Sequence, residues 1–354
     1  MWPAHLPSPK GRGTALNPAG RFERLVFEPD PDADTADSSG PVPTEFFRDT
    51  SRSVLTRNDS DDIPFTYSLN PYRGCEHGCI YCYARPYHEY LGFSAGLDFE
   101  TKILVKEDAP ERLRDALRAR TWIGEPIALS GATDAYQPAE RRLQLTRRCL
   151  EVIADCRQPV SVITKSGLVA RDADLLAELA RVSAANVALT ITTLDEQRRR
   201  ALEPRASSAD VRFGAVSTLA RLGIPVGVMV APVIPGLTDH EIPAILARAR
   251  DAGASWAGYV MLRLPQGIGP FFEAWLVEHV PGQRARVLGR VRHVRNGRLN
   301  DPRFGWRMRG EGPMAALTAR LFSRARDRAG LAKAAPPLSS AAFHRPATVG
   351  PLFQ

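Results

Sequence analysis

Three cysteines within eight residues, Cys75, Cys79 and Cys82, have a C-x3-C-x2-C spacing that could hold one compact metal centre. Thiolates are soft metal ligands, and Gly74 and Gly78 supply the backbone freedom that such a tight loop requires. Disulfides would not explain three clustered cysteines in a chain that has only five among 354 residues. Two kinds of centre remain: a [4Fe-4S] cluster, on which three thiolates leave one iron open to an external molecule, and a tetrahedral zinc ion.

Zinc would need a fourth protein ligand, for which His77 and His88 are the candidates. Structural zinc sites usually use two ligand pairs separated by a longer spacer, and this sequence has no second pair. We therefore favour the iron–sulfur cluster and interpret His77 as a loop residue. The remaining cysteines, Cys149 and Cys156, fall on one apolar stripe of a predicted helix, which indicates buried structural thiols.

The elements that position this loop alternate between short β-rich runs and helical stretches. We predict strands at 65–69, 127–130, 160–165, 187–193, 226–233 and 258–264, and helices at 140–156, 172–182, 209–222, 239–251 and 271–279. This alternation implies a parallel sheet with right-handed crossovers, so we expect an α/β fold, a partial (β/α)6 TIM-type barrel. The cysteine loop directly follows the first strand, at the carboxyl end, where such folds carry their chemistry.

The sequence divides into four predicted parts. Residues 1–50 lack periodicity and should form a disordered or draped arm, 51–280 the barrel, 281–332 an arginine-rich C-terminal extension, and 333–354 a tail. No apolar run approaches the ~20 residues of a membrane-spanning helix, and the N-terminus has no apolar signal segment. We therefore expect a cytoplasmic protein without a membrane partner.

Positive charge is concentrated in the C-terminal extension. Between residues 284 and 328 there are 13 arginines, no lysine and three acids, while the whole chain has a net charge of +8. Arg303, Arg307 and Arg309 alternate with Phe304 and Trp306, a pattern that could contact phosphates and stack on bases. This pattern predicts DNA or RNA as a partner, and the alternative is a solvated arginine-rich face.

The cysteine spacing, with the aromatic Tyr81 directly before the third cysteine, is similar to the hallmark of the radical S-adenosylmethionine (SAM) superfamily. The runs NPYRGC at 70–75 and YCYA at 81–84 resemble the branch related to spore photoproduct lyase, also called DNA repair photolyase-like. The resemblance covers about residues 64–278.

This resemblance implies an enzyme whose three cysteines, Cys75, Cys79 and Cys82, bind a [4Fe-4S] cluster. SAM would chelate the open iron, and an external flavodoxin- or ferredoxin-like donor would reduce the cluster. Reductive cleavage would then release a 5'-deoxyadenosyl radical, which the barrel must shield from water.

The resemblance also assigns SAM-binding roles to residues at the strand ends. Ser130, Thr133 and Asp134 follow the second strand, where the family places the motif that holds the SAM amino group. Lys165, one of five lysines in the chain, ends the third strand and resembles the lysine that pairs with the SAM carboxylate. The alternatives are an ordinary turn capped by Asp134 and a surface lysine.

Two further strand ends complete the expected SAM site. Thr190 and Thr192 share one face of the fourth strand and could meet a ribose or a carboxylate, or simply fill a tapered core. Val233 and Ile234 match the family loop that flanks adenine.

One departure limits the resemblance. Spore photoproduct lyase returns a hydrogen atom from a cysteine near the end of its second strand, but residues 128–134 contain no cysteine. Tyr83 and Tyr136 are the candidate hydrogen-atom relays. The sequence thus predicts modification or repair of a nucleic acid; radical chemistry on a protein or small molecule and a non-catalytic metal-stabilised module are the alternatives.

Overall fold

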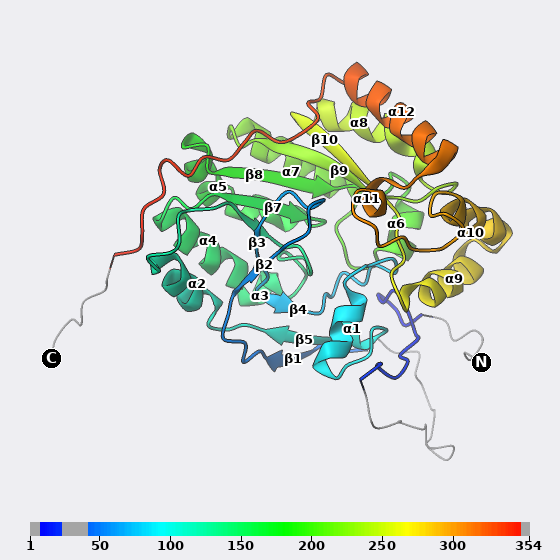
Figure 1. The fold of residues 1–354 in the computed structure, drawn as a ribbon, viewed down its shortest axis with the longest axis horizontal. Coiled ribbons are helices and arrows are strands. Elements are labelled where there is room, and N and C mark those ends of the chain that lie inside the picture. The colour runs from blue at the N-terminus through cyan, green and yellow to red at the C-terminus, as the bar shows by residue number, and fades with distance from the viewer. Residues whose placement is uncertain (1–7, 23–41, 348–354) are drawn as a thin grey trace, which may run out of the picture.

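Seven strands form the main sheet of the computed structural model, which describes residues 8–22 and 42–347 (Figure 1). Their spatial order is β10-β9-β8-β7-β6-β3-β2. The strands are β2 (Leu55–Arg57), β3 (Tyr67–Leu69), β6 (Ile127–Leu129), β7 (Val160–Thr164), β8 (Ala185–Thr190), β9 (Val226–Val233) and β10 (Trp256–Met261). Six of them are parallel and follow one another in chain order, with only β2 antiparallel at the edge. The predicted α/β partial barrel is confirmed.

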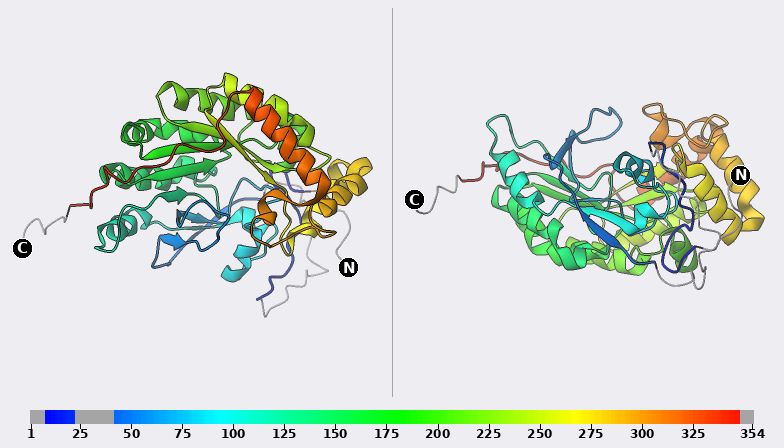
Figure 2. Two further views of the ribbon diagram at one scale, coloured as in Figure 1. Left: turned by 45° about the horizontal axis from the view of Figure 1, so that its top comes forward. Right: turned by 90° about the horizontal axis from the view of Figure 1, so that it is seen from below.

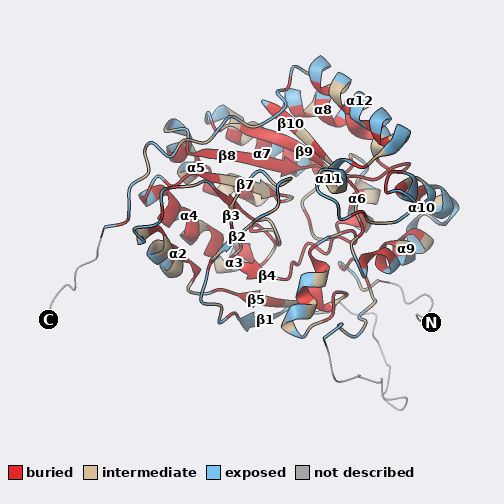
Figure 3. Cartoon of the chain, in the orientation of Figure 1, coloured by how far each residue is buried: buried red, intermediate tan, exposed pale blue. Residues whose placement is uncertain are grey.

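Helices follow the parallel strands from β6 onwards. They are α3 (Glu140–Leu143), α4 (Leu145–Asp155), α5 (Ala173–Arg181), α6 (Glu196–Leu202), α7 (Ala209–Arg221), α8 (Ile242–Asp251) and α9 (Ile268–His279), with short 3-10 turns η2 (Gly167–Asp172) and η3 (Asp239–Glu241). Because helices cover the parallel strands, β8 is buried along its whole length (Figure 3). Cys149 and Cys156 lie fully buried in this core, which confirms their structural role.

A second, three-stranded sheet, absent from the sequence-based prediction, lies beside the barrel in the order β1-β5-β4. It consists of β1 (Glu45–Arg48), β4 (Tyr72–Arg73) and β5 (Lys102–Val105), flanked by η1 (Arg85–Leu91), α1 (Asp98–Thr101) and α2 (Ala109–Arg118). None of its strands exceeds four residues, too few for a recognisable alternation of side chains. β1 also shows that the predicted draped arm ends in a strand.

Residues 8–22 of the predicted arm lie against the loop that precedes α1, whereas 1–7 and 23–41 fall outside the described residues. The Leu97 N–H, for example, donates to the Leu16 carbonyl over 2.9 Å. The predicted domain boundaries stay predictions.

The C-terminal extension forms η4 (Pro281–Gln283), α10 (Arg284–His293), α11 (Trp306–Arg309) and α12 (Gly312–Arg328). Helix α12, orange in Figure 2, lies along α8. The described part of the predicted tail packs across the amino ends of the strands, where the His344 N–H donates to the Cys156 carbonyl and the Ser339 N–H to the Ser183 carbonyl. Within residues 8–22 and 42–347, no helix combines the length and apolar character needed to cross a bilayer.

Candidate cofactor site

The cysteine loop follows β3 and β4 and ends at η1, at the carboxyl end of the main sheet. Gly74 and Gly78 have φ angles of +79° and +67°, a conformation that favours glycine. Cys75 and Cys79 are each 7% exposed, and Cys82 is partly exposed. The loop therefore bends back on itself and turns its first two cysteines away from solvent.

Buried polar contacts fix the shape of this loop. The fully buried Gln137 side chain donates to the Gly74 carbonyl over 3.2 Å and accepts from the Glu76 N–H over 2.8 Å. The Cys75 N–H donates to the Phe99 carbonyl over 2.8 Å. Gln137, which the sequence did not single out, thus positions the segment around the first cysteine.

The N-terminal segment also closes over the loop. A Cβ atom on Gly13 would lie 2.0 Å from the Gly78 carbonyl oxygen, so only glycine fits there without a backbone shift. The Gly13 N–H donates to the buried Glu100 carboxylate over 2.8 Å, and Arg12 donates to the Glu100 carbonyl over 2.7 Å. Glu100 in turn forms a buried ion pair with Arg85.

The chemistry of the three thiols fits a cationic cluster. Burial raises the pKa of Cys75, Cys79 and Cys82, and for Cys79 and Cys82 the nearby Lys165 opposes this rise. A bound cation would supply the charge that buried thiols need to ionise. Across the described ranges, no three histidine, cysteine or carboxylate side chains already converge on a common metal-binding point, so the ligand roles stay a prediction.

His77 lies inside the loop, where its Nδ1 is 3.3 Å from Asp134 Oδ2. Asp134 also accepts from Thr164 Oγ1 and from the Lys165 N–H, both over 2.7 Å. Burial alone would raise the pKa of Asp134, but His77 and these hydrogen bonds lower it to about 2. Asp134 therefore joins the cysteine loop to the end of β7, and its predicted contact with SAM stays a prediction.

The structure brings three other predicted SAM residues together. Lys165 Nζ donates to the Ala231 carbonyl over 2.9 Å and lies 3.4 Å from Thr192 Oγ1 and 5.6 Å from the centre of the Tyr81 ring. Its side chain is 16% exposed. Lys165 is therefore not a surface lysine; it points across the carboxyl ends of β8 and β9 towards the loop.

Glu203, which the sequence analysis missed, completes this group. Its carboxylate forms a buried ion pair with Arg212, accepts hydrogen bonds from Tyr81 and Thr192, and lies 3.4 Å from Lys165. Burial alone would raise the pKa of Glu203, but Arg212 and Lys165 hold it well below its usual range. Two cations thus face one carboxylate, which leaves one positive charge for an anionic group.

Replacing Glu203 by glutamine should destabilise the fold strongly, because Arg212 would stay buried without its counter-ion. Breaking a buried ion pair costs about 3–5 kcal/mol. Glu196→Gln is the matched control: Glu196 pairs with Arg199 and Arg200 but is 42% exposed, so at most ~1 kcal/mol should be lost. Urea unfolding of the metal-free protein measures both, and equal midpoints would contradict the argument.

The other predicted cofactor residues are more scattered. Ser130 Oγ accepts from the Ala135 N–H, and Thr133 Oγ1 donates to the Tyr72 carbonyl, so both hydroxyls have partners within the protein. Ile234 packs in the same apolar cluster as Cys79 and Tyr81. Val233 lies in the main core, and Thr190 is buried at the end of β8. Their roles towards SAM stay predictions.

The two candidate hydrogen-atom relays differ in accessibility. Tyr83, which directly follows the third cysteine in the sequence, is 39% exposed, and its hydroxyl donates to the Gly131 carbonyl. Tyr136 is 1% exposed and lies in the main core. Accessibility therefore favours Tyr83.

Each arginine predicted to bind nucleic acid already has a partner within the protein. Arg303 pairs with Asp301 and Glu311, and Arg307 with Asp62. Arg309 donates to the Tyr259 carbonyl over 3.1 Å and lies 4.4 Å from the centre of that ring. Trp306 is 48% exposed. The arginines are thus less available to phosphate than their sequence pattern suggested.

Comparison with known proteins identifies the family to which the chain is similar and gives an independent match for its fold. A sequence model described as the Radical SAM superfamily matches residues 69–249. An uncharacterized protein of Mycobacterium tuberculosis is 37% identical over 221 residues, which are 62% of this chain and 65% of that protein. A protein of Pseudomonas phage M6 named radical SAM Nα-GlyT isomerase is 26% identical over 215 residues, which are 56% of this chain and 42% of the phage protein.

A solved structure of a spore photoproduct lyase mutant matches with a TM-score of 0.56 and 15% identity, covering 81% of each chain. At this identity the match establishes the fold alone. The chain spans about 65% of the length of the mycobacterial relative.

Proposed function

The chain belongs to the radical SAM superfamily, and from this premise we propose that it binds its cluster through Cys75, Cys79 and Cys82 and cleaves SAM to modify a nucleic acid. Members of the superfamily are enzymes that use a [4Fe-4S] cluster and SAM. When bound and reduced, these cofactors supply a 5'-deoxyadenosyl radical. An external flavodoxin- or ferredoxin-like donor would provide the electron, and a reducing cytoplasm suits the free thiols.

One observation carries the cofactor part of this proposal: Lys165 lies 5.6 Å from the centre of the ring of Tyr81, the residue directly before Cys82. Lys165 and Arg212 both face the single carboxylate of Glu203, which leaves one positive charge in surplus beside the cysteine loop. A SAM carboxylate placed between the loop and Lys165 would meet a cation in a partly desolvated site. Tyr81 and Thr192 would orient this lysine through the hydrogen bonds that they share with Glu203.

Production of 5'-deoxyadenosine tests this assignment. After anaerobic reconstitution with iron and sulfide, the protein given dithionite and SAM should release 5'-deoxyadenosine slowly even without a substrate, as measured by liquid chromatography. Omitting dithionite is the control and should stop the release. A fully loaded cluster that never cleaves SAM would contradict the proposed activity.

The nucleic-acid part rests on the resemblance to spore photoproduct lyase and on aromatic side chains beside the loop. Tyr83, Tyr87 and Phe304 are all exposed. The Arg263 guanidinium lies 4.7 Å from the centre of the Tyr83 ring, and Arg307 lies 4.7 Å from that of Phe304. Exposed rings bordered by arginines can stack on unpaired bases.

A salt titration distinguishes nucleic acid from other substrates. Phosphates that a protein neutralises release counterions, so the logarithm of the binding constant falls with the logarithm of the salt concentration in proportion to the number of contacts. Replacing Arg303, Arg307 and Arg309 together by glutamine should therefore reduce this slope for oligonucleotide binding by the equivalent of about three phosphate contacts. Trp306→Ala should weaken single-stranded more than duplex binding. Fluorescence anisotropy under anaerobic conditions measures both.

The internal partners of these arginines favour the second candidate, radical chemistry on a protein or small molecule. If oligonucleotide binding has the same salt dependence in the triple variant and in the unmodified protein, this second candidate takes precedence. The cluster and substrate-free SAM cleavage should be unchanged in all variants.

A further inference from the structure

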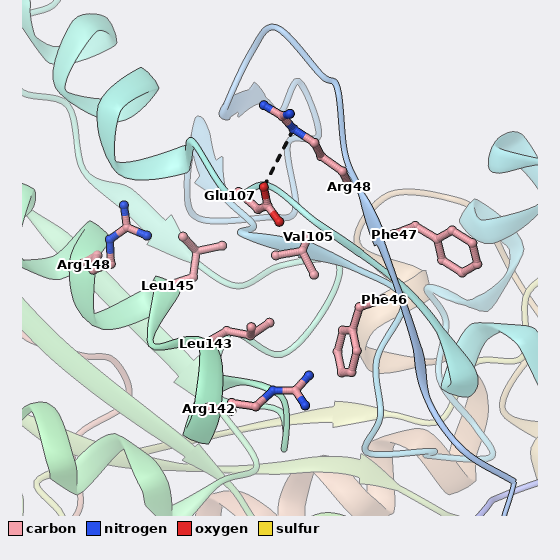
Figure 4. A pocket seen from close by; sticks show the side chains of 9 residues that line it. All are labelled: Phe46, Phe47, Arg48, Val105, Glu107, Arg142, Leu143, Leu145 and Arg148. Atoms are coloured by element: carbon pink, nitrogen blue, oxygen red, sulfur yellow. Dashed lines mark ion pairs between the residues drawn. The ribbon is translucent and has the colours of Figure 1, made fainter.

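The second sheet has an exposed edge at β1. All four residues of this strand are exposed, and β1 pairs only with β5 among the described strands. A cavity of about 190 Å³ opens between β1 and the α3–α4 corner (Figure 4), lined by Phe46, Phe47, Arg48, Val105, Glu107, Arg142, Leu143, Leu145 and Arg148. The two phenylalanines of β1, Phe46 and Phe47, are each 37% exposed. Natural proteins usually cover or charge an edge strand that exposes apolar side chains.

Arginine side chains border the cavity at this edge. Three arginines and one glutamate line it, and one of these arginines, Arg148, pairs with Glu111 at 3.0 Å. The Arg142 guanidinium lies 4.8 Å from the centre of the Phe46 ring, and the Arg48 side chain is 70% exposed, with Glu107 at 3.8 Å. We call Phe46, Phe47, Arg48 and Arg142 the edge patch. Its combination of arginine and aromatic side chains suits an acidic protein surface.

A series of rings connects the edge patch with the cysteine loop. Phe47 turns away from Phe46 in Figure 4, and its ring centre lies 5.4 Å from that of Phe93. Phe93 stacks on the buried His88 at 5.3 Å, and His88 meets Phe99 at 5.6 Å. Phe99 packs against Cys75, and the Phe99 backbone carbonyl accepts a hydrogen bond from the Cys75 N–H.

We propose that the edge patch docks an acidic one-electron donor protein and that these rings form its route to the cluster. The inference rests on the proposed function. One electron leaves the donor, which is oxidised by one equivalent, and reduces the cluster by one; no bond or proton changes in this transfer. Cys75 and Cys79 are buried, so an electron that approaches the cluster from the β1 side crosses protein. Entry at β1 leaves the carboxyl end of the barrel free for SAM and the substrate.

Charge reversal tests the docking. In Arg48→Glu/Arg142→Glu, cluster reduction by prereduced flavodoxin at low salt should slow at least tenfold, because electrostatic steering accelerates association by ~10- to 1,000-fold. Anaerobic stopped-flow absorbance measures the rate. Arg320→Glu/Arg324→Glu is a matched double reversal on exposed residues of α12, which lies on the opposite side of the molecule from β1 (Figure 1), and this variant should react like the unmodified protein.

A second variant tests the route, and dithionite separates the possible failures. Phe93→Leu keeps an apolar side chain but removes a ring, so reduction at saturating flavodoxin should slow while half-saturation stays unchanged. Both variants should cleave SAM normally with dithionite. If dithionite yields no 5'-deoxyadenosine in the unmodified protein, the proposed function fails. If that reaction works but flavodoxin reduces the edge-patch variant at the normal rate, the docking proposal is overturned. A normal rate in Phe93→Leu overturns the route.

Discussion

Replacing any one of Cys75, Cys79 and Cys82 by alanine is expected to remove nearly all of the bound iron, from about four atoms per chain to a small fraction of one. Burial makes the loss severe, because solvent cannot readily replace a missing thiolate at the two cysteines that are 7% exposed. Iron and sulfide analysis after anaerobic reconstitution measures this outcome.

Cys149→Ala and Cys156→Ala provide the matched controls. Both thiols are fully buried in the main core, so these substitutions should leave the iron content intact. A protein that binds zinc and no iron would contradict the cluster assignment. Equal iron loss in a core variant and a loop variant would show that the loss reflects folding rather than ligation.

Lys165→Ala is expected to weaken SAM binding more than tenfold. Removing one partner of a charge pair in a desolvated site costs ~2–5 kcal/mol. In this variant the remaining charges, Arg212 and Glu203, neutralise each other, so no positive charge would be left for a carboxylate. Equilibrium dialysis with the oxidised, cluster-loaded protein measures the dissociation constant without turnover.

Lys333→Ala is the control for this substitution. Lys333 is exposed beyond α12, so its loss should leave SAM binding unchanged. A dissociation constant that stays constant in Lys165→Ala would mean that the lysine only supports the Ala231 carbonyl and Glu203.

The parallel sheet could be predicted because its strands lie in β-rich runs that alternate regularly with helical stretches along the chain. Strand β9 coincides with the predicted run at 226–233. The second sheet could not, since β1, β4 and β5 gain their identity only by pairing with one another. Strand pairing between distant segments leaves no local pattern in such short runs.

The candidate site shows the same division. Local spacing was enough to single out the cysteines, and the scarcity of lysine singled out Lys165. Glu203 had no comparable signal, because it follows an arginine-rich run in which an acid resembles any surface ion-pair partner. Conversely, Arg303 and Arg307 looked free in the sequence, but tertiary structure pairs them with Glu311 and Asp62.

The contact of Gly13 with the cysteine loop bears on the order in which the chain is assembled. Residues 12 and 13 are synthesised early, yet their partner Glu100 lies 88 residues further along the chain than Arg12. The N-terminal segment therefore has no surface to bind until the loop and α1 have formed. Contacts between residues so far apart in the sequence form late in folding. The proposed cluster would therefore have an interval for assembly in which Gly78 is still uncovered, and the binding of Gly13 over the loop would end that interval.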